Sequence, residues 1–468
     1  MTFDPLALHK EYEEYYDTWQ TCRDAATGQR AVHAGGEKYL PKLSGQNDLD
    51  YKAYLKRALY FNATGRTVEG MVGLCFRKQP TTDLPPALEA YVSDINLSGE
   101  SLEGFSRNLV EAIIKTGRAG ILVDYPPQPE LESALTVEQA RVMGQRPYIS
   151  SYSAESIRNW RLGRVGNVHK LINLSLSESY ENEDGETKTQ IRELSLEPKY
   201  VQRVWREVKT GKDAEWAIYS EHTPTINGQS LEEIPFFFVA PKEADSRVQS
   251  PPIESLAYVN IAHYRNSADL ENGAHVAGQP TPWVNGITDP ENFPTLHLGS
   301  NTFLKLPLDA EAGFLQCGSE GFSTLEKAMD RKEEQMAALG ARMLAGEKKQ
   351  AETAEALEIK RGGESSVLAS LVGSVEMTIS AALKFMALWV GANPEEVRFE
   401  LNKDFLPYPM DAQMLTAWVS AWQSGGFSYE TFIGGLQRGE LIPETVTAED
   451  EAERIGLEPA LGMINEQV

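Results

Sequence analysis

The sequence is short of basic residues. Its 468 residues include 44 Lys and Arg against 68 Asp and Glu, which gives a formal net charge of −24. A protein that grips DNA through its phosphates needs an excess of Lys and Arg, because its affinity comes from releasing condensed counterions. The balance here excludes tight phosphate-mediated binding by the chain as a whole. Either nucleic acid is irrelevant to this protein, or DNA passes it without being held.

Long apolar runs and clustered cysteines are also lacking. No run reaches the ~18 apolar residues that a membrane-spanning helix needs, and the closest approach, Met377 to Val390, is interrupted by Lys384. An acid, Asp4, stands where a signal peptide would carry bases, so we expect no export. The three cysteines lie far apart: Cys22, Cys75 and Cys317. Their spacing fits no metal site, which favours a reducing compartment and roles as small buried hydrophobes.

Catalytic and cofactor motifs are missing too. The chain has no phosphate-binding Gly-x-x-x-x-Gly-Lys-Ser/Thr loop, no Gly-x-Gly-x-x-Gly, no His-Glu-x-x-His and no Gly-x-Ser-x-Gly. A hydrophobic strand ending at Asp124 imitates the metal-holding strand of an ATPase, but without the upstream loop a strand-end turn residue is the better interpretation. The seven histidines are dispersed, and satisfied polar roles are the default for them. We expect no enzyme activity, cofactor or metal site.

One cluster of residue types is compatible with nucleic-acid binding. Trp160, Arg161, Arg164 and Lys170 combine an aromatic ring with basic side chains, as single-strand binding surfaces do. A half-buried β corner with solvated basic side chains explains the same residues, and the net negative charge of the chain favours this second interpretation.

Local patterns predict an α+β protein. Helical periodicity begins at Tyr51 and resumes from Val68 to Cys75, and a further helix is expected from Leu102, with Ser101 as its N-cap and Gly117 as its stop. A strand should follow at residues 119–123. Residues 147–240 predict antiparallel strands, with hairpin turns at 184–185 and 227–228.

The most informative pattern is a helix, a short insertion and a returning helix. Ser250-Pro-Pro predicts the start of a helix that runs to about Val276, with the two prolines in its first turn. A Pro- and Gly-rich segment, 278–321, follows and contains a predicted strand at 302–306. The second helix is expected to begin at Ser323, which forms a capping box with Glu326. The first helix is rich in residues that permit close helix packing: Ala257, Ala262, Ser267, Ala268, Gly273 and Ala274.

Beyond the second helix lies a polar segment, 346–352, and then a third long amphipathic pattern through residues 368–390. The pair Gly362-Gly363 weakens this pattern by about 1 kcal/mol per glycine, so a break or kink is expected there. A strand over 397–405 and short helices carrying Trp418 and Trp422 complete the chain.

Two segments resemble those of tailed-bacteriophage portal proteins (head-tail connectors). Residues 51–80, YKAYLKRALYFNATGRTVEGMVGLCFRKQP, are similar to the N-terminal wing of that family. Residues 102–105 with 117–126, GRAGILVDYP, are similar to its next element. The order helix, insertion, helix from 250 to 344 is similar to a portal's stem, clip and returning stem. The resemblance covers nearly the whole chain from about residue 50.

The resemblance implies a portal fold of class α+β, with a helical wing plus β module, long stem helices, a small α/β clip and a helical C-terminal crown. Its implied parts are a wing (1–250), a first stem helix (251–277), a clip (278–321), a second stem helix (322–345), a tunnel loop (346–353), a long wing helix with a strand (354–402), and a crown with the C-terminal tail (403–468). In that arrangement the small and apolar faces of the stem helices would be buried by neighbouring subunits.

The resemblance also implies a function. Portals form a homododecameric ring at one vertex of a phage capsid, through which double-stranded DNA enters and leaves. The implied partners are a terminase large subunit, a head-tail adaptor and the major capsid protein, with no membrane, and the implied location is the virion after assembly in a bacterial cytoplasm. The tunnel-loop residues that would face DNA are Glu347, Lys348, Lys349, Gln350 and Glu352. Two other classes stay open: a cytosolic helical adaptor or scaffold without a DNA channel, and an enzyme whose site is assembled from scattered acids.

Overall fold

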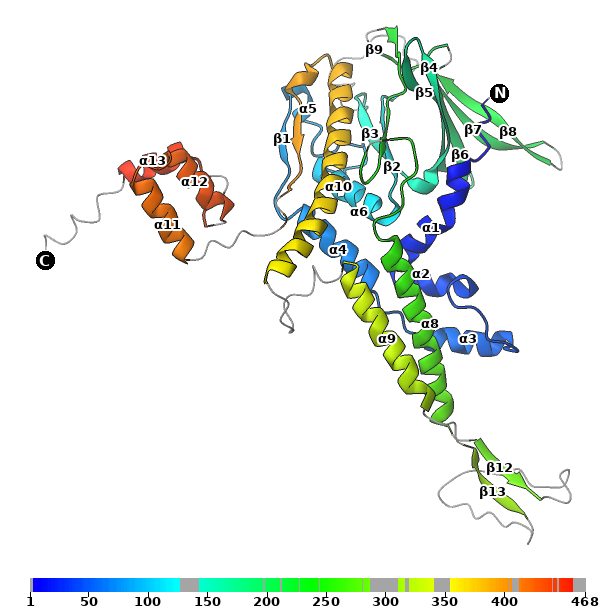
Figure 1. Ribbon diagram of the computed structural model, residues 1–468. Helices are drawn as coiled ribbons and strands as arrows, with labels where there is room; N and C mark the ends of the chain where they lie inside the picture. The colour runs from blue at the N-terminus through cyan, green and yellow to red at the C-terminus, as the bar shows by residue number, and fades with distance from the viewer. Residues whose placement is uncertain are drawn as a thin grey trace, which may run out of the picture. The chain divides into compact units, whose positions relative to one another are not determined.

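The computed structural model describes residues 3–126, 143–196, 198–210, 213–226, 228–243, 245–279, 281–286, 310–315, 320–340, 354–403, 405, 412–439, 441–443 and 446–457. The chain divides into two compact units, Met1–Asn402 and Lys403–Val468, and each is described by itself. Figure 1 labels their helices and strands. Helices alternate with antiparallel strand pairs, which confirms the expected α+β class.

The first unit begins with helices whose ends follow local sequence signals. They are α1 (Lys10–Thr27), α2 (Gln29–Ala34), α3 (Asp48–Arg57), α4 (Ala63–Cys75), α5 (Pro86–Glu89) and α6 (Leu102–Thr116). Ser101 Oγ accepts a hydrogen bond from the Gly104 N–H and starts α6. Gly117 ends the helix at φ 66°, a left-handed conformation that favours glycine. The predicted helix at 102–116 is confirmed with both of its caps. The periodicity that begins at Tyr51 corresponds to two helices, α3 and α4.

A three-stranded sheet and a long helix form the core of this unit. The sheet has the order β11-β2-β3, with β11 (Phe236–Val239), β2 (Ala119–Asp124) and β3 (Tyr148–Ser153). The central strand β2 is buried along its whole length, as the hydrophobic sequence at 119–123 predicts. Helix α10 (Ala354–Trp389) packs against β2, β11 and α6. Its buried side chains include Leu371, Val375, Ile379, Leu383 and Met386.

Part of α10 is also long and apolar enough to cross a membrane. This part is Leu368–Trp389, with a mean hydropathy of 1.5, and 61% of that window is buried inside the protein. Its packing against β2 and β11 is that of a core helix. Helix α10 continues through Gly362 and Gly363, so the break expected at these glycines is not found.

A second sheet is a five-stranded antiparallel meander in the order β4-β5-β6-β7-β8. Its strands are β4 (Ile157–Val165), β5 (Val168–Glu181), β6 (Thr187–Ser195), β7 (Val201–Thr210) and β8 (Asp213–His222). Gly166 (φ 62°) and Gly185 (φ 77°) occupy left-handed turn positions. The predicted hairpin at Asp184-Gly185 is confirmed, since β5 and β6 pair on either side of it.

Two smaller strand pairs complete the β structure of this part of the unit. Strands β9 (Thr225–Ile226) and β10 (Gln229–Ser230) pair across the turn that contains Gly228, as predicted. Strand β1 (Thr81–Asp83) pairs with β14 (Arg398–Glu400), which follows α10. The predicted strand at 397–405 is therefore present in shorter form.

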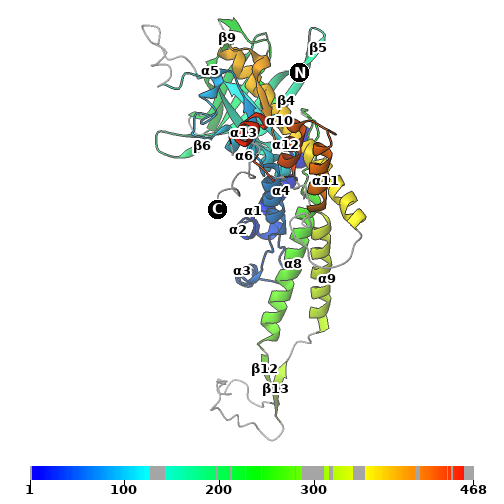
Figure 2. The same ribbon diagram turned by 90° about the vertical axis from the view of Figure 1, so that its left-hand side faces the viewer.

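The helix–insertion–helix pattern is present, with shifted starts. Helix α8 (Glu254–Ala277) begins after Pro251 and Pro252, because the Glu254 N–H donates to the Pro251 carbonyl in a turn that precedes the helix. The expectation that both prolines lie in the first helical turn is wrong. Strands β12 (Thr281–Asn285) and β13 (Glu311–Leu315) follow and pair with each other. Helix α9 (Glu320–Ala338) begins three residues before the expected Ser323. In Figures 1 and 2, α8 and α9 run side by side.

The second unit contains α11 (Ala412–Gln423), α12 (Tyr429–Arg438) and α13 (Ala448–Leu457). Ser428 caps α12 by accepting from the Thr431 N–H. Trp422 stacks on Phe432 at 4.6 Å between ring centroids, and Trp418 lies 4.6 Å from Phe427. The predicted tryptophans at i and i+4 therefore join α11 to α12.

Candidate functional site

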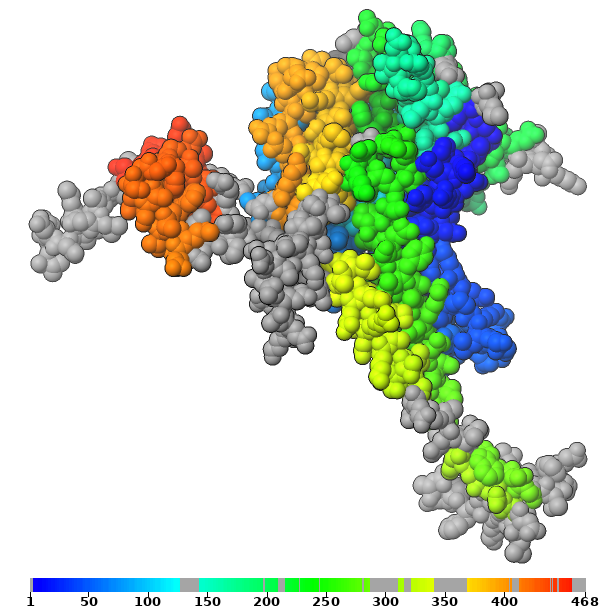
Figure 3. All heavy atoms as spheres, in the orientation of Figure 1, coloured from blue at the N-terminus to red at the C-terminus, as the bar shows by residue number. Residues whose placement is uncertain are grey.

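The antiparallel pair α8–α9 is the candidate site, because it carries the insertion β12–β13 between its two helices. Gly273, near the end of α8, lies against Phe322, near the start of α9. Further along the pair, His263 Nε2 lies 3.2 Å from Glu333 Oε1. Residue numbers fall along α8 from the first contact to the second while they rise along α9, so the two helices are antiparallel. In the space-filling view, α9 lies at the surface (Figure 3).

Helix α8 is fixed to the body of the unit through a buried amide. Asn260 is fully buried, and its Oδ1 accepts from the Thr64 N–H (3.1 Å), the Thr64 hydroxyl (2.8 Å) and the Tyr60 hydroxyl (2.9 Å). Its Nδ2 donates to the Phe61 carbonyl at 2.8 Å. The amide thus satisfies the Thr64 N–H and hydroxyl at the start of α4, which would otherwise be buried without partners.

Polar contacts continue along the outer part of α8. The Tyr54 hydroxyl donates to Asp269 Oδ1 at 2.6 Å, and burial together with this carboxylate raises the pKa of Tyr54 above its usual range. Arg265 Nε donates to the Tyr39 carbonyl at 2.8 Å. Helices α1 and α3 both pack against α8.

The small residues of α8 pack inside the subunit. Ala257 and Ala268 are fully buried, and Ser267 is 6% exposed. A Cβ on Gly273 would lie only 2.5 Å from Phe322 Cε1. The expectation that neighbouring subunits bury these faces is therefore wrong for Ala257, Ser267 and Ala268. Close packing within one chain fills the space instead, and of the predicted small residues Ala274 is the exposed one.

Helix α9 presents a mostly charged surface. Met336 is buried in a cluster with Ala63, Leu256 and Val259, while Leu339 is 44% exposed. Six described charged side chains on this helix are exposed: Glu326, Lys327, Asp330, Arg331, Glu333 and Glu334. The apolar side chains of α9 are thus only partly inside the chain, with Leu325 and Met329 half-buried.

The insertion between the helices is a hairpin with exposed aromatics. Trp283 pairs with Gly313 across β12 and β13, and a Cβ on Gly313 would lie 3.0 Å from the indole nitrogen. Trp283 and Phe314 are exposed. Sequence reasoning missed both strands. The strand that it predicted, at residues 302–306, lies outside the described residues.

The predicted tunnel-loop residues cannot be placed on this geometry. All five lie in the segment 341–353, outside the described residues: Glu347, Lys348, Lys349, Gln350 and Glu352.

The candidate nucleic-acid patch on β4 is not assembled. Trp160 is buried between two partners: the His9 ring stacks on it at 3.7 Å, and the Arg118 guanidinium lies 4.1 Å from its centroid. Arg161 Nε donates to Asn173 Oδ1. The indole face is therefore unavailable to a base, and the alternative of a half-buried β corner is the better description.

Asp124, the strand-end acid, lies in a satisfied buried network. Its carboxylate accepts from Gln202 at 2.9 Å and lies 3.5 Å from an Arg192 nitrogen. Arg192 Nε also donates to Glu178 at 2.7 Å. Burial alone raises the pKa of Glu178, but Arg192 and the hydrogen bonds to Tyr152 and neighbouring groups outweigh it and hold that pKa below its usual value. The network joins β2, β3, β5, β6 and β7, which is a structural role.

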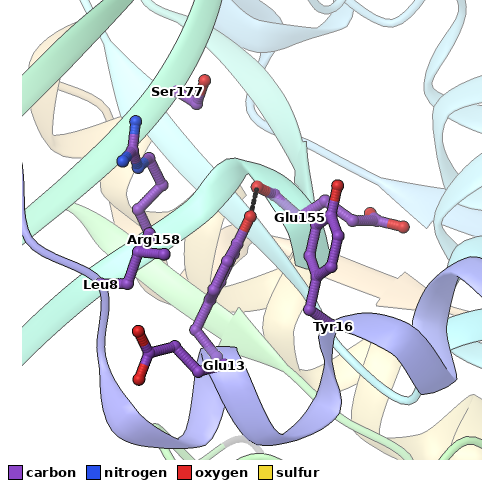
Figure 4. Close-up of a pocket in the computed structure, with 7 residues that line it drawn as sticks. Leu8, Glu13, Tyr16, Glu155, Arg158 and Ser177 are labelled. Atoms are coloured by element: carbon purple, nitrogen blue, oxygen red, sulfur yellow. Dashed lines mark hydrogen bonds between the residues drawn. The ribbon is translucent and has the colours of Figure 1, made fainter.

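A shallow pocket beside α1 offers no catalytic arrangement either (Figure 4). It is lined by Leu8, Tyr12, Glu13, Tyr16, Glu155, Arg158 and Ser177. The Glu155 carboxylate already accepts two hydrogen bonds from Arg23, at 2.9 and 2.8 Å. Glu13 and Ser177 lie apart in the close-up. A nucleophile beside a base, the signature of covalent catalysis, is not found in this pocket.

The described cysteines are buried thiols. Cys22 and Cys75 are free and fully buried, as expected, and burial raises the pKa of each thiol to about 12. Cys317 lies outside the described residues. Among the residues that the structure describes, no group of three His, Cys, Asp or Glu is arranged to hold a metal ion.

Comparison with known proteins gives one family match. Residues 252–390 match a family described as "Domain of unknown function (DUF4055)". The match spans α8, β12, β13, α9 and α10, which is less than half of the chain. No curated protein matches the chain.

Solved structures with similar chains include those of gene transfer agent particles. One, "Virion of native gene transfer agent (GTA) particle", is 13% identical, with 87% of this chain and 97% of that chain covered and a TM-score of 0.38. Another, "Neck of native GTA particle computed with C12 symmetry", is 12% identical, with 79% and 88% covered and the same TM-score. At this TM-score the similarities establish neither a shared fold nor a shared function.

Proposed function

We propose that the chain is the subunit of a portal ring, a homododecamer at one vertex of a phage-type capsid that forms the channel for DNA packaging and ejection. The observation that carries the proposal is the antiparallel pair α8–α9, braced on one side by α1, α3 and α4 and interrupted by the hairpin β12–β13. This arrangement suits an assembly of side-by-side subunits. The wing-like sequence at 51–80 supports the same reading.

In this proposal each part has one role. Residues 251–277 and 322–345 are the stem, and 278–321 form the clip, on which terminase and the head-tail adaptor dock. Residues 1–250 and 354–402 form the wing, and 403–468 form the crown and C-terminal tail. The major capsid protein is a further partner of the ring. The net charge of −24 fits a lumen that repels phosphate and lets DNA slide.

Native mass measurement with negative-stain imaging tests the assembly. Purified full-length chain should form a large closed ring, since head-to-tail contacts between identical subunits close when the rotation permits. A monomer or dimer would remove the portal and favour a helical adaptor or scaffold. Retention of a nucleotide or metal through purification would favour the enzyme alternative.

The clip assignment has its own test. Replacing residues 278–321 with a short Gly/Ser linker should leave soluble protein that no longer binds the packaging terminase. Undiminished terminase binding would move the docking site elsewhere.

The segment 346–353 is proposed as the tunnel loop. Lys348 and Lys349 would touch phosphates transiently, while Glu347 and Glu352 limit how tightly DNA is held; Gln350 completes the polar surface. Such contacts are electrostatic and weakened by salt. Changing both lysines to glutamate should leave the ring intact and alter packaging or retention of DNA in assembled heads. Normal packaging and retention in those heads would overturn the assignment.

A further inference from the structure

Helices α3 and α9 pack on different sides of α8. His263 of α8 lies 3.2 Å from Glu333 of α9, whereas Asn272 of α8 accepts from Arg57 of α3 at 2.8 Å. The two α8 positions are nine residues apart in the sequence, about two and a half helical turns, so they face nearly opposite ways. Both ribbon views show α8 between the other two helices (Figures 1 and 2). The faces that α3 and α9 turn away from α8 therefore cannot meet within one copy of the chain.

The exposed side of α9 carries a line of acids. Glu326, Asp330 and Glu334, the acidic line, recur at every fourth position, so they lie one above the other along the helix. All three are exposed, and none is in an ion pair with a described residue. Lys327 and Arg331 form a separate basic line beside them. Acids four residues apart destabilise a helix by repelling each other, so a cationic partner would stabilise the acidic line.

The exposed side of α3 has the opposite charge. Leu49, Lys52 and Lys56 are spaced by three and four residues, so they share one face of the helix. All three are exposed, Leu49 at 78%, and neither lysine is in an ion pair with a described residue. Asp48, one turn before Lys52, already binds Lys42 at 2.8 Å. The charges that this face offers to a partner are therefore the two lysines, which complement the acidic line of α9.

The two faces also lie at one level along α8. Gly273 of α8 lies against Phe322 of α9, and the two helices are antiparallel. Four residues back along α8 is Asp269, and four residues on along α9 is Glu326, so these two residues lie at one level. Asp269 is also the residue that accepts from the Tyr54 hydroxyl of α3, at 2.6 Å. When α8 and α9 run along the axis of the proposed ring, neighbours are related by rotation alone, so faces at one level meet.

We infer that the acidic line of α9 in one subunit binds the two lysines of α3, Lys52 and Lys56, in the next copy of this chain. The inference deepens the proposed ring and rests on it. Because the complementary faces lie on different sides of α8, each contact leaves one face free at either end, and contacts continue head to tail until the ring closes. A single exposed ion pair contributes little, but unlike charges repeated at every contact decide which faces meet.

Charge reversal in the full-length chain tests this contact. One variant combines Lys52→Glu with Lys56→Glu, and the other combines Glu326→Lys with Asp330→Lys. Each places like charges opposite each other, which opposes association, so neither variant alone should form the ring at low salt, as measured by native mass. Mixing the two purified variants should restore rings in which they alternate, because every contact then joins unlike charges again. Restoration also shows that both variants had folded.

A matched control reverses two exposed acids outside both faces. Glu183→Lys with Asp184→Lys, in the β5–β6 turn, makes the same change in net charge and should form rings unaided. Rings from either test variant alone would overturn the inference and leave the proposed function standing. A mixture that stays without rings, or that gives only dimers through a twofold contact, would overturn it too. An unaltered chain that forms no ring would remove the proposed function, and this inference with it.

Discussion

The two helices of the antiparallel pair differ in what surrounds them. Helix α8 has eight buried residues, among them Asn260, His263 and Ser267, which are polar. Among the described side chains of α9, at positions 321–338, only Met336 is buried. Helix α8 is thus part of the subunit's interior, whereas most of the described side chains of α9 are exposed or half-buried. Substitutions of buried residues on α8 should therefore change the folding stability. Substitutions on the exposed side of α9 should instead change contacts between the subunit and other molecules.

The largest effect is expected at Asn260. Asn260→Leu removes the partner of the Thr64 N–H and of the Thr64 hydroxyl while leaving both groups buried. Each unsatisfied buried group costs about 1–3 kcal/mol, so the free energy of unfolding should fall by about 2–6 kcal/mol. Urea unfolding followed by circular dichroism measures the loss. Asn266→Leu, at a half-buried position on the same helix, is the control and should change it far less. A loss below about 1 kcal/mol for Asn260→Leu would contradict the role given to this amide.

A smaller effect is expected from adding volume to α8. Ala268 is fully buried, so Ala268→Leu should overpack the subunit's own interior and cost about 1–3 kcal/mol in unfolding free energy. Ala274→Leu makes the same substitution at an exposed position of the same helix and should leave the free energy of unfolding nearly unchanged. If Ala268→Leu instead left monomer stability intact and prevented ring formation, the small residues would face a neighbouring subunit after all.

Helices α6 and α8 show how much of the fold can be predicted from the sequence. Ser101 and Gly117 act on adjacent backbone groups, so the sequence alone predicts both ends of α6. Small residues along α8 predict close packing but not its partner, because the contact with Phe322 joins residues far apart in the chain. The resemblance implied a second subunit as the partner, whereas Ala257, Ser267 and Ala268 are buried inside one chain.

Non-local pairing explains the other differences. Strands β12 and β13 pair residues 281–285 with 311–315, and no turn signal joins segments separated in this way. The capping box at Ser323 is a local signal, but α9 continues for another turn before it, to Glu320. The prolines before α8 fit a turn equally well, and the hydrogen bond from Glu254 to the Pro251 carbonyl decides where the helix begins.

The smallest effect on folding is expected on the exposed side of α9, and it sharpens the contrast with α8. Asp330 and Glu334 are exposed, one turn apart, and neither is in an ion pair with a described residue. Surface substitutions away from packed features usually change the free energy of unfolding by less than about 0.5 kcal/mol, so Asp330→Ala with Glu334→Ala should fall in that range. If this face meets a neighbouring subunit or passing DNA, the same variant should still change how ring formation or DNA retention depends on salt, because exposed charges act through screened fields. Comparing ring formation at low and high salt with unfolding of the same protein separates the two effects. A loss of folding stability as large as that of Ala268→Leu would mean that α9, like α8, belongs to the interior of the subunit.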